Sequence, residues 1–316
     1  MFQILTNANF RIIPRRRMMM LISTLLILTG IASMVLHGGL KMGIDFRGGY
    51  KFIVEFEKDV ELSTIRQALI ENGLEGGQVS DFGSSNEVLV VLDSQVADLP
   101  EDNAGGDIVQ LRLAETMRNA FPGNPVQEIS QEKVGPKIGA ELRNDAFWAI
   151  IYSLLGIIAY ITWRFEFKFS IAAITALVHD VLITLGIFSL LDKELNLTIL
   201  GALLTIVGYS LNDTIVVFDR IRENLRGRSR SEAYAEVVNT SVNQTLSRTV
   251  ITSLTTLIVV LILFFFGGPV IHDFAFALTV GVLVGTYSSL FIASPVLVEW
   301  QAASQRRRQK KLAAKG

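Results

Sequence analysis

Residues 208–223 read GYSLNDTIVVFDRIRE. The stretch places two polar side chains, Asn212 and Asp213, inside an apolar run that begins at Leu197, and it becomes densely charged only after Phe218. An ionisable side chain at the centre of a bilayer costs at least ~2.5 kcal/mol on insertion scales. Because of this cost, an acidic residue in an apolar helix usually belongs to an ion pathway or a proton relay. The stretch therefore predicts a membrane helix with a functional carboxyl group at Asp213.

The composition of the whole chain also indicates a membrane protein. The chain has 316 residues, of which 50% are hydrophobic, and its mean hydropathy is +0.42. A helix needs about 20 apolar residues to cross the ~30 Å hydrocarbon layer. Stretches of roughly that length lie at 18–36, 146–163, 169–191, 197–218, 249–266 and 274–298. The predicted fold class is an α-helical integral membrane protein with six transmembrane helices.

Charge is distributed unevenly, although the formal net charge is only -1. Residues 38–145 contain 10 Lys/Arg and 19 Asp/Glu, whereas most other basic residues lie at alternate ends of the apolar stretches. By the positive-inside rule those ends are cytoplasmic, which places both termini inside and the acidic segment outside, in the periplasm. Basic clusters can also bind nucleic acid, but beside membrane spans they are better explained by topology and anionic lipid. No nucleic-acid partner is expected.

The expected organisation is a cytoplasmic arm, a first helix, an external domain, a five-helix bundle with one cytoplasmic loop, and a basic cytoplasmic tail. The ranges are 1–17, 18–37, 38–143, 144–300 with the loop at 219–247, and 301–316. The basic residues before the first helix resemble those of a signal peptide, but its apolar stretch exceeds the usual ~7 to 15 residues, so it is expected to remain uncleaved. The arm alternates apolar and polar residues, which predicts that it lies on the membrane surface.

The external segment predicts a small α+β domain. Half-buried strands are indicated at 50–57, 78–82, 87–92 and 125–132, and amphipathic helices at 63–72 and 107–120. The order βαββαβ is the ferredoxin-like arrangement. The segment has no phosphate loop, no metal-spaced cluster and no Ser/His/Asp set, so we expect it to bind rather than to catalyse, with no cofactor and no metal. The chain has no cysteine, which excludes disulfides.

Two glycine-containing motifs connect this domain to the helices. Gly48 and Gly49 follow Asp45, and paired glycines permit positive φ angles. Gly135, Pro136 and Gly139 stand where the chain returns to the membrane, and a proline disfavours helix at the preceding residue. Both motifs are consistent with hinges, although an ordinary tight turn before a strand would explain the first equally well.

Small residues form a face on the fourth apolar stretch. They recur at intervals of four, three and four residues, at Gly201, Thr205, Gly208 and Asn212. Such a face lets a neighbouring helix approach closely. In the sixth stretch Gly281 and Gly285 form a second pair of this kind, and that helix is expected to end before Pro295.

Three further charged or titratable residues lie within the apolar stretches. His179 and Asp180 are neighbours, so on a helix they point about 100° apart and are not expected to pair with each other; they form either a satisfied structural pair or part of a hydrated path. Arg248 belongs to a polar stripe that enters the fifth stretch. Arg248 could extend to the membrane interface, or it could face Asp213 across the bundle, where opposite charges would lower each other's cost of burial.

Several motifs together resemble one known family. They are DFRGG at 45–49, VGPKIGAEL at 134–142, HD at 179–180, the stretch 208–223 quoted above, and SRT at 247–249. With these motifs the chain resembles the SecF proteins of the SecD/SecF family over essentially its full length.

The resemblance implies a subunit that pairs with SecD in a bacterial inner membrane, in a fold related to the resistance-nodulation-division (RND) exporters. It implies association with the SecYEG channel, YajC and the SecA-driven translocon, and use of the proton-motive force in late steps of the export of an unfolded polypeptide. The family's acid and arginine for proton passage match Asp213 and Arg248. Asn212, His179 and Asp180 complete the expected proton relay, and no catalytic site is implied.

Other functions stay open at this point. A proton-coupled small-molecule exporter of the RND type would need a deep apolar pocket, which one small external domain does not offer without a partner. A static scaffold of the translocon would use Asp213 and Arg248 only for assembly. An intramembrane aspartyl protease would need two acids on facing helices, which Asp180 and Asp213 could supply, but the chain has no GxGD motif.

Overall fold

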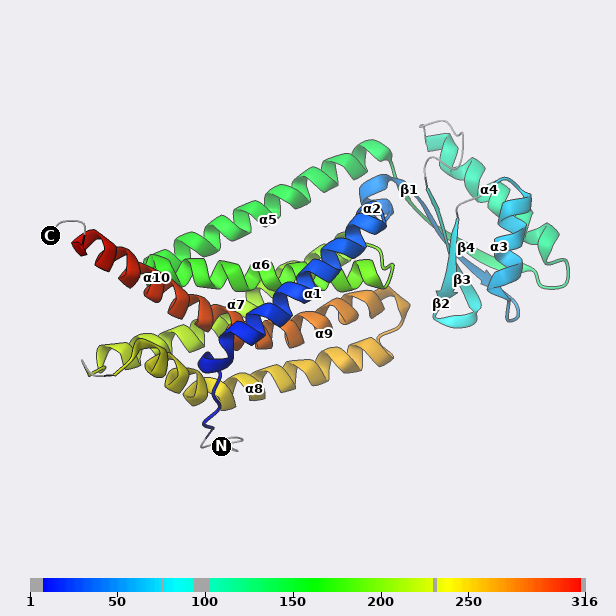
Figure 1. The fold of residues 1–316 in the computed structure, drawn as a ribbon. Helices are drawn as coiled ribbons and strands as arrows, with labels where there is room; N and C mark the ends of the chain where they lie inside the picture. Colours follow the sequence, from blue (N-terminus) through cyan, green and yellow to red (C-terminus); the bar gives the residue numbers. More distant parts are fainter. Residues whose placement is uncertain (1–7, 75–76, 94–102, 230–231, 314–316) are drawn as a thin grey trace.

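A computed structural model describes residues 8–74, 77–93, 103–229 and 232–313. In these ranges six helices are long and apolar enough to cross a membrane, which confirms the predicted number. The first five are α1 (Arg16–Leu36), α5 (Pro136–Arg164), α6 (Phe167–Leu190), α7 (Leu197–Arg226) and α8 (Tyr234–Phe266). The sixth begins as α9 (Pro269–Ser288). The described start of α1 and end of α10 lie toward the end of the bundle away from the external domain (Figure 1).

The sixth helix does not end before Pro295, so that prediction is wrong. α9 continues through a π-helical turn, η2 (Ser289–Ala293), into α10 (Ser294–Ala313). Pro295 lies in the first turn after η2, where a missing N–H costs little. The Ser294 hydroxyl donates to the carbonyl of Ser289, five residues earlier, at 3.2 Å. The π turn thus lets one long helix pass a proline.

The external domain is a four-stranded antiparallel sheet with two helices. Its strands, β1 (Gly49–Phe56), β2 (Gln78–Phe82), β3 (Ser84–Asp93) and β4 (Val126–Val134), are arranged in the order β2-β3-β1-β4. Helices α3 (Leu62–Glu71) and α4 (Asn103–Ala120) complete the predicted βαββαβ order. Alternate residues of β1 (Phe52, Val54 and Phe56) are fully buried in its core. The ferredoxin-like prediction is confirmed.

Glycines set how closely the membrane helices pack. A Cβ added at Gly30 of α1 would lie 2.7 Å from the Cα of Gly186 in α6. A Cβ at Gly281 of α9 would collide with Ile206 of α7, and one at Gly285 would lie 3.0 Å from the Cβ of Ser210. The predicted small pair of the sixth helix therefore brings α9 against α7.

The predicted small-residue face of α7 is not packed within this chain. Gly201, Thr205, Gly208 and Asn212 are all exposed. A Cβ added at Gly201 or Gly208 would have no neighbour within 4 Å among the described residues. These four residues share a face, as expected, but its role in packing stays a prediction.

The described part of the N-terminal arm, residues 8–15, packs against α8, and its location at the membrane surface stays a prediction. The side-chain oxygen of Asn239 accepts hydrogen bonds from the backbone N–H groups of Ile12 and Ile13, at 3.0 and 3.1 Å. Asn243 accepts from the N–H of Phe10 at 2.7 Å and donates to the Phe10 carbonyl at 2.9 Å. Ile12 and Ile13 are buried in the bundle core, because apolar side chains there gain more than at a surface.

Candidate functional site

Asp213 lies inside the bundle and is 2% exposed. Its two carboxyl oxygens face α8, where the Thr252 hydroxyl donates to Oδ1 at 3.5 Å and the Ser253 hydroxyl donates to Oδ2 at 3.3 Å. Thr286 of α9 donates in turn to the Ser253 hydroxyl at 2.7 Å. Asp213 is therefore held by neutral hydroxyl groups at long distances, in a chain of donors that reaches α9.

Arg248 does not pair with Asp213 in this structure. Its side chain is exposed, and no ion pair joins these two described residues. Arg248 precedes Thr252 by one turn of α8, and its carbonyl accepts the Thr252 hydroxyl at 3.0 Å. Thr252 and Ser253 thus make the hydrogen bonds of α8 to Asp213 in this structure, and the pairing of Arg248 with the carboxyl stays a prediction.

A second carboxyl group, Asp180 of α6, is completely buried. Its Oδ2 accepts the hydroxyls of Ser210 on α7 at 2.6 Å and Ser288 on α9 at 2.8 Å. Its Oδ1 lies 2.9 Å from Nδ1 of His179. The expectation that the two neighbours do not pair is wrong, because side-chain torsions close the gap that their helical positions leave. Asp180 is fully bonded and ties three helices together.

His179 continues this polar cluster toward α1. Its ring stacks on Tyr287 with centroids 5.9 Å apart. The Tyr287 hydroxyl donates to the Met19 carbonyl at 3.0 Å and accepts from Ser23 at 3.1 Å. His179 is 4% exposed, and its Nε2 has no hydrogen-bond partner in the described structure. One ring nitrogen is therefore available for a water molecule or a proton.

The two carboxyl groups belong to one polar layer without touching each other. Ser210 and Asp213 are one turn apart on α7, and such positions are neighbours on a helix surface. Ser288 and Thr286 connect the same two carboxyl groups from α9. Asn212 points out of the bundle. The structure thus brings together Asp213, Asp180 and His179, and leaves Arg248 and Asn212 on the surface.

The two predicted hinge motifs meet at the end of the bundle near the domain. Gly48, with φ +82°, ends the short helix α2 (Ile44–Arg47) before β1. A Cβ added at Gly139 would lie 3.1 Å from both the Gly48 nitrogen and the Phe46 carbonyl carbon. The first turn of α5, which begins at Pro136 with Gly135 as its N-cap, therefore packs directly on α2.

Asp45 of α2 reaches the helix that carries Asp213. Its Oδ2 accepts the backbone N–H of Leu197, the first residue of α7, at 2.8 Å. The side chain of Asn196 caps the same helix by accepting the N–H of Ile199 at 2.9 Å. Sequence reasoning treated Asp45 only as a turn residue. In the structure, Asp45 directly bonds α2, which connects to the external domain, to the start of α7.

Glu194 joins the loop before α7 to the external domain. It accepts a hydrogen bond from Gln78 of β2. Burial raises the pKa of the Glu194 carboxyl, whereas this hydrogen bond and the charges of Lys41 and Arg47 act in the opposite direction. Nearby, Lys41 pairs with Asp192 at 2.8 Å. The contact region between the external domain and the helix bundle is therefore polar, and its titratable group with a raised pKa is Glu194.

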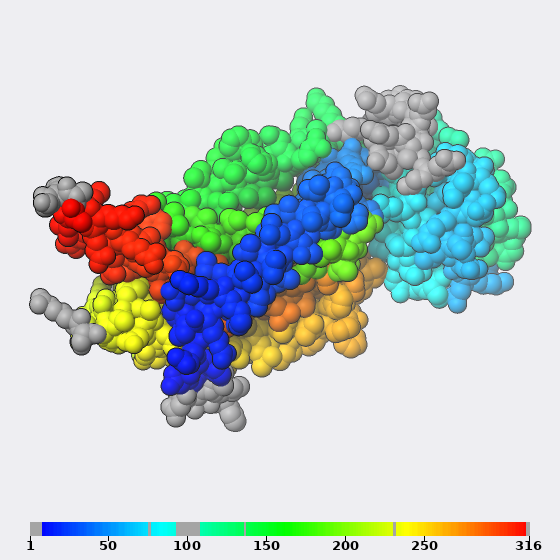
Figure 2. All heavy atoms as spheres, viewed as in Figure 1, coloured from blue at the N-terminus to red at the C-terminus, as the bar shows by residue number. Residues whose placement is uncertain are grey.

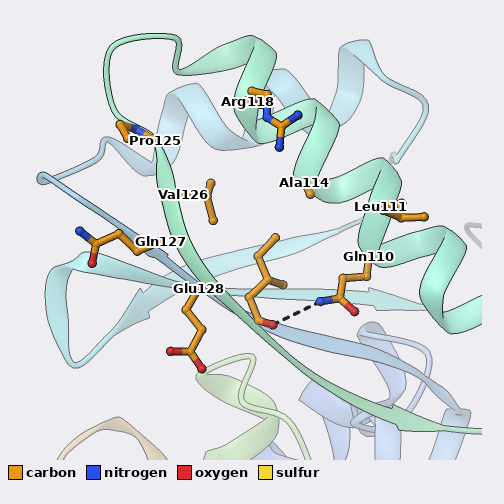
Figure 3. Close-up of a pocket in the computed structure, with 9 residues that line it drawn as sticks. Gln110, Leu111, Ala114, Arg118, Pro125, Val126, Gln127 and Glu128 are labelled. Carbon is orange, nitrogen blue, oxygen red and sulfur yellow. Dashed lines mark hydrogen bonds between the residues drawn. The ribbon is translucent and has the colours of Figure 1, made fainter.

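The external domain has one open groove that Figure 3 draws, between α4 and β4. Its volume is about 590 Å3, and Leu111, Ala114 and Val126 contribute apolar surface. Gln110 donates to the carbonyl of Ile129 at 3.3 Å across the groove. Within the described ranges, no group of three or more His, Asp or Glu side chains could hold a metal ion.

Sequence reasoning missed the hydroxyl groups that hold the two carboxyl groups. Among them, Ser253, Thr286 and Ser288 were not singled out. The available signal was the number of serines and threonines in apolar helices. Single hydroxyl residues satisfy themselves on their own helix backbone, as Thr286 also does with the Val282 carbonyl, so their presence alone does not locate a site.

These features define a multi-pass membrane protein with an inserted ferredoxin-like domain and carboxyl groups buried between its helices. Residues 113–303 match the model of the family described as protein export membrane protein SecD/SecF, C-terminal, and residues 35–60 match the SecD/SecF GG motif. The protein translocase subunit SecF of Rhodothermus marinus is 44% identical over 97% of this chain and 98% of its own length. The chain belongs to the SecD/SecF family and aligns end to end with its SecF subunits.

Solved structures agree with this assignment. The crystal structure of SecDF, a translocon-associated membrane protein from Thermus thermophilus, is 39% identical, has a TM-score of 0.81, and covers 95% of this chain. A crystal structure of SecDF in a super-membrane-facing form is 38% identical, has a TM-score of 0.67, and covers the whole chain. This chain spans 40% and 41% of the length of those two chains.

Proposed function

We propose that this chain is the SecF subunit of a bacterial protein-export machinery, and that with SecD it uses the proton-motive force to promote late steps of translocation. The observation that carries the proposal is the environment of Asp213. A buried carboxyl held by the neutral hydroxyl groups of Thr252 and Ser253, with Thr286 donating to Ser253, can exchange a proton without breaking an ion pair. Family membership supports the proposed setting, a bacterial inner membrane with both termini in the cytoplasm.

Proton passage would act by repacking α7 against α8. When Asp213 is protonated it can donate as well as accept, so its bond to either Thr252 or Ser253 reverses direction while the other oxygen still accepts. When it is ionised, Arg248 on the surface of α8 is the nearest candidate to move toward it. Each proton that crosses inward releases ~2.3 kcal/mol per 100 mV. A few protons therefore supply enough free energy to shift a population between two arrangements.

The external domain is the proposed moving part. α7 begins at the backbone N–H that Asp45 accepts, and Asp45 belongs to the α2 turn that packs on Gly139 and leads into β1. A displacement of α7 would thus reach the sheet through bonded contacts. The lower TM-score to the super-membrane-facing SecDF, at full coverage, supports a fold whose parts adopt more than one arrangement.

The expected partners follow from family membership and from one exposed surface. The open face of Gly201, Thr205, Gly208 and Asn212 suits a closely approaching helix, and we assign it to SecD. SecYEG, YajC and the SecA-driven translocon would contact the assembled pair, and an unfolded exported polypeptide would be the substrate.

The test is Asp213→Asn, with Asp219→Asn as a matched control. Both changes replace a carboxyl by an amide on α7, but Asp219 is exposed and 3.5 Å from Arg164. The variants are reconstituted in vesicles with SecD, SecYEG and SecA, and export of an unfolded protein is measured with and without a protonophore. We expect Asp213→Asn to lose the part of export that depends on the proton gradient, and Asp219→Asn to keep it.

Three outcomes would contradict the proposal. Gradient-dependent export that survives in Asp213→Asn would show that this carboxyl is not the coupling group. Failure of Asp213→Asn to assemble with SecD would instead favour the scaffold. An added small-molecule substrate that is pumped by the wild-type pair would favour an RND-type exporter.

A further inference from the structure

A cavity at the basic end of the bundle lies between the N-terminal arm and the helices behind it. We name it the arm groove, and it is formed by arm residues 9–12 and 15 together with Met19, Leu246, Leu290 and Phe291. Its volume is about 470 Å3, within the ~300–1,000 Å3 of typical small-molecule sites. In Figure 2 the arm, in dark blue, lies below α1 and beside α8, in yellow. The inner wall of the groove is apolar.

The arm is a fixed wall of this groove. Asn239 and Asn243 bond both the N–H groups and the Phe10 carbonyl of the arm, and Ile12 and Ile13 are buried behind it. The hydrogen bonds leave little freedom to the segment that carries Arg11 and Arg15. The backbone positions from which Arg11 and Arg15 extend at the groove are therefore set by the fold.

Charge at the arm groove is positive and uncompensated. Arg16 is neutralised by Glu299 at 2.7 Å. Arg11 and Arg15 are exposed and make no ion pair within the described residues, and the residues that line the groove include no acid. An anion that enters the groove would meet two guanidinium groups, which bind phosphate well because of their planar donor geometry.

The groove lies at the level of the membrane where a phospholipid could bind. Met19 stands in the first turn of α1, where the apolar span follows the basic residues 15–17. This is the level at which headgroup phosphates meet acyl chains. We propose that the arm groove binds one anionic phospholipid, whose phosphate lies at Arg11 and Arg15 and whose acyl chain lies along Met19, Leu290 and Phe291. The proposal does not depend on proton coupling by Asp213.

A lipid explains both halves of the groove, whereas other ligands explain only one. A free phosphate ion would use the arginines but not the apolar wall. A helix of a partner protein would cover the apolar wall, but it would need an acidic group placed between two arginines. An anionic phospholipid has both a phosphate for the arginines and hydrocarbon for the apolar wall, and it is abundant at the membrane surface.

The test compares lipids and arginine variants by native mass spectrometry of the purified full chain. Phosphatidylglycerol and phosphatidylcholine with identical acyl chains are added in parallel. We expect one phosphatidylglycerol to bind per chain where phosphatidylcholine does not. Arg11→Gln and Arg15→Gln should each weaken binding about fivefold, and the double variant about 25-fold, from ~1 kcal/mol for each basic residue. The matched control Arg17→Gln, which does not line the groove, should bind as the wild type.

Four results would overturn the proposal. The first is equal binding of the two lipids, and the second is an equal loss of binding in Arg17→Gln and the double variant. The third is binding of inorganic phosphate as tight as that of phosphatidylglycerol. The fourth comes from a photo-crosslinking residue placed at position 10 in intact membranes, if it yields a protein adduct in place of a lipid adduct. The third would mean a bare anion site, and the fourth would mean a protein partner. A lipid adduct at position 10 would support the proposal.

Discussion

Breaking the bond between Asp45 and Leu197 should weaken the link between the external domain and α7 at small cost to the helix. Asp45→Ala removes an acceptor 2.8 Å from the first N–H of α7. Loss of an N-cap side chain costs about 1 kcal/mol, and loss of a negative charge near a helix N-terminus costs roughly 0.3–1 kcal/mol more. The expected loss is therefore about 1–2 kcal/mol, local to the first turn of α7.

Asn196→Ala is the matched control. Asn196 caps the same helix through the N–H of Ile199 at 2.9 Å, so its removal should also cost about 1 kcal/mol. Asn196 precedes α7 in the chain and does not belong to α2, however. The control therefore weakens the helix start but keeps the bond to the domain connection.

Two measurements separate these effects. Hydrogen exchange at the first turn of α7 should accelerate about fivefold or more in both variants, since local opening becomes easier by ~1 kcal/mol. Gradient-dependent export in reconstituted vesicles should fall strongly in Asp45→Ala and remain in Asn196→Ala. Equal export in the two variants would refute the reasoning, because helix stability alone would then account for the whole effect.

Two further predictions concern buried acids. Asp180→Asn should destabilise the chain by about 1.5–3 kcal/mol, because the amide keeps only one acceptor oxygen and its nitrogen must face either His179 or the hydroxyls of Ser210 and Ser288; thermal unfolding in detergent measures this, and an unchanged midpoint would contradict it. Burial raises the pKa of Glu194, so the folded state binds this proton more tightly than the unfolded state. The contribution of this proton to the stability of the fold is thus complete at pH below the pKa of Glu194 in the unfolded state, near 4.5. It is lost as pH rises through the raised pKa of the folded state. Glu194→Gln should remove this slope and raise stability at neutral pH in a thermal series, and an unaltered slope would contradict the assignment; Gln78→Ala is a control that keeps the carboxyl.

Sequence patterns predicted the strands and helices well where apolar residues recur with a single period. Alternation along β1 placed Phe52, Val54 and Phe56 in the core, where all three are buried. The cost of an acid in lipid pointed to Asp213, which is buried as expected. Both inferences depend on local chemistry, which the sequence carries directly.

Other features depend on which neighbour a helix face meets, and a helical period does not specify that. The polar stripe that includes Arg248 is real, but α8 turns Thr252 and Ser253 toward Asp213 and leaves Arg248 exposed. The bond between His179 and Asp180 depends on side-chain torsions that helical angles do not fix. The cap from Asp45 joins residues 152 positions apart, and no local pattern encodes a contact of that separation.

The π turn η2 has a consequence for how the sixth helix can change by insertion or deletion. One extra residue in that turn shifts the helical phase by about 100°. The side chains of α10 are therefore rotated about the helix axis by that angle relative to those of α9. α9 sets Gly281 and Gly285 against α7, and α10 independently sets Leu297 into a different cluster. Deleting one residue from 289–293 would restore ordinary α-helical phase and rotate the two halves relative to each other. The basic tail would then leave the bundle on another side, although every other residue of the chain remained the same.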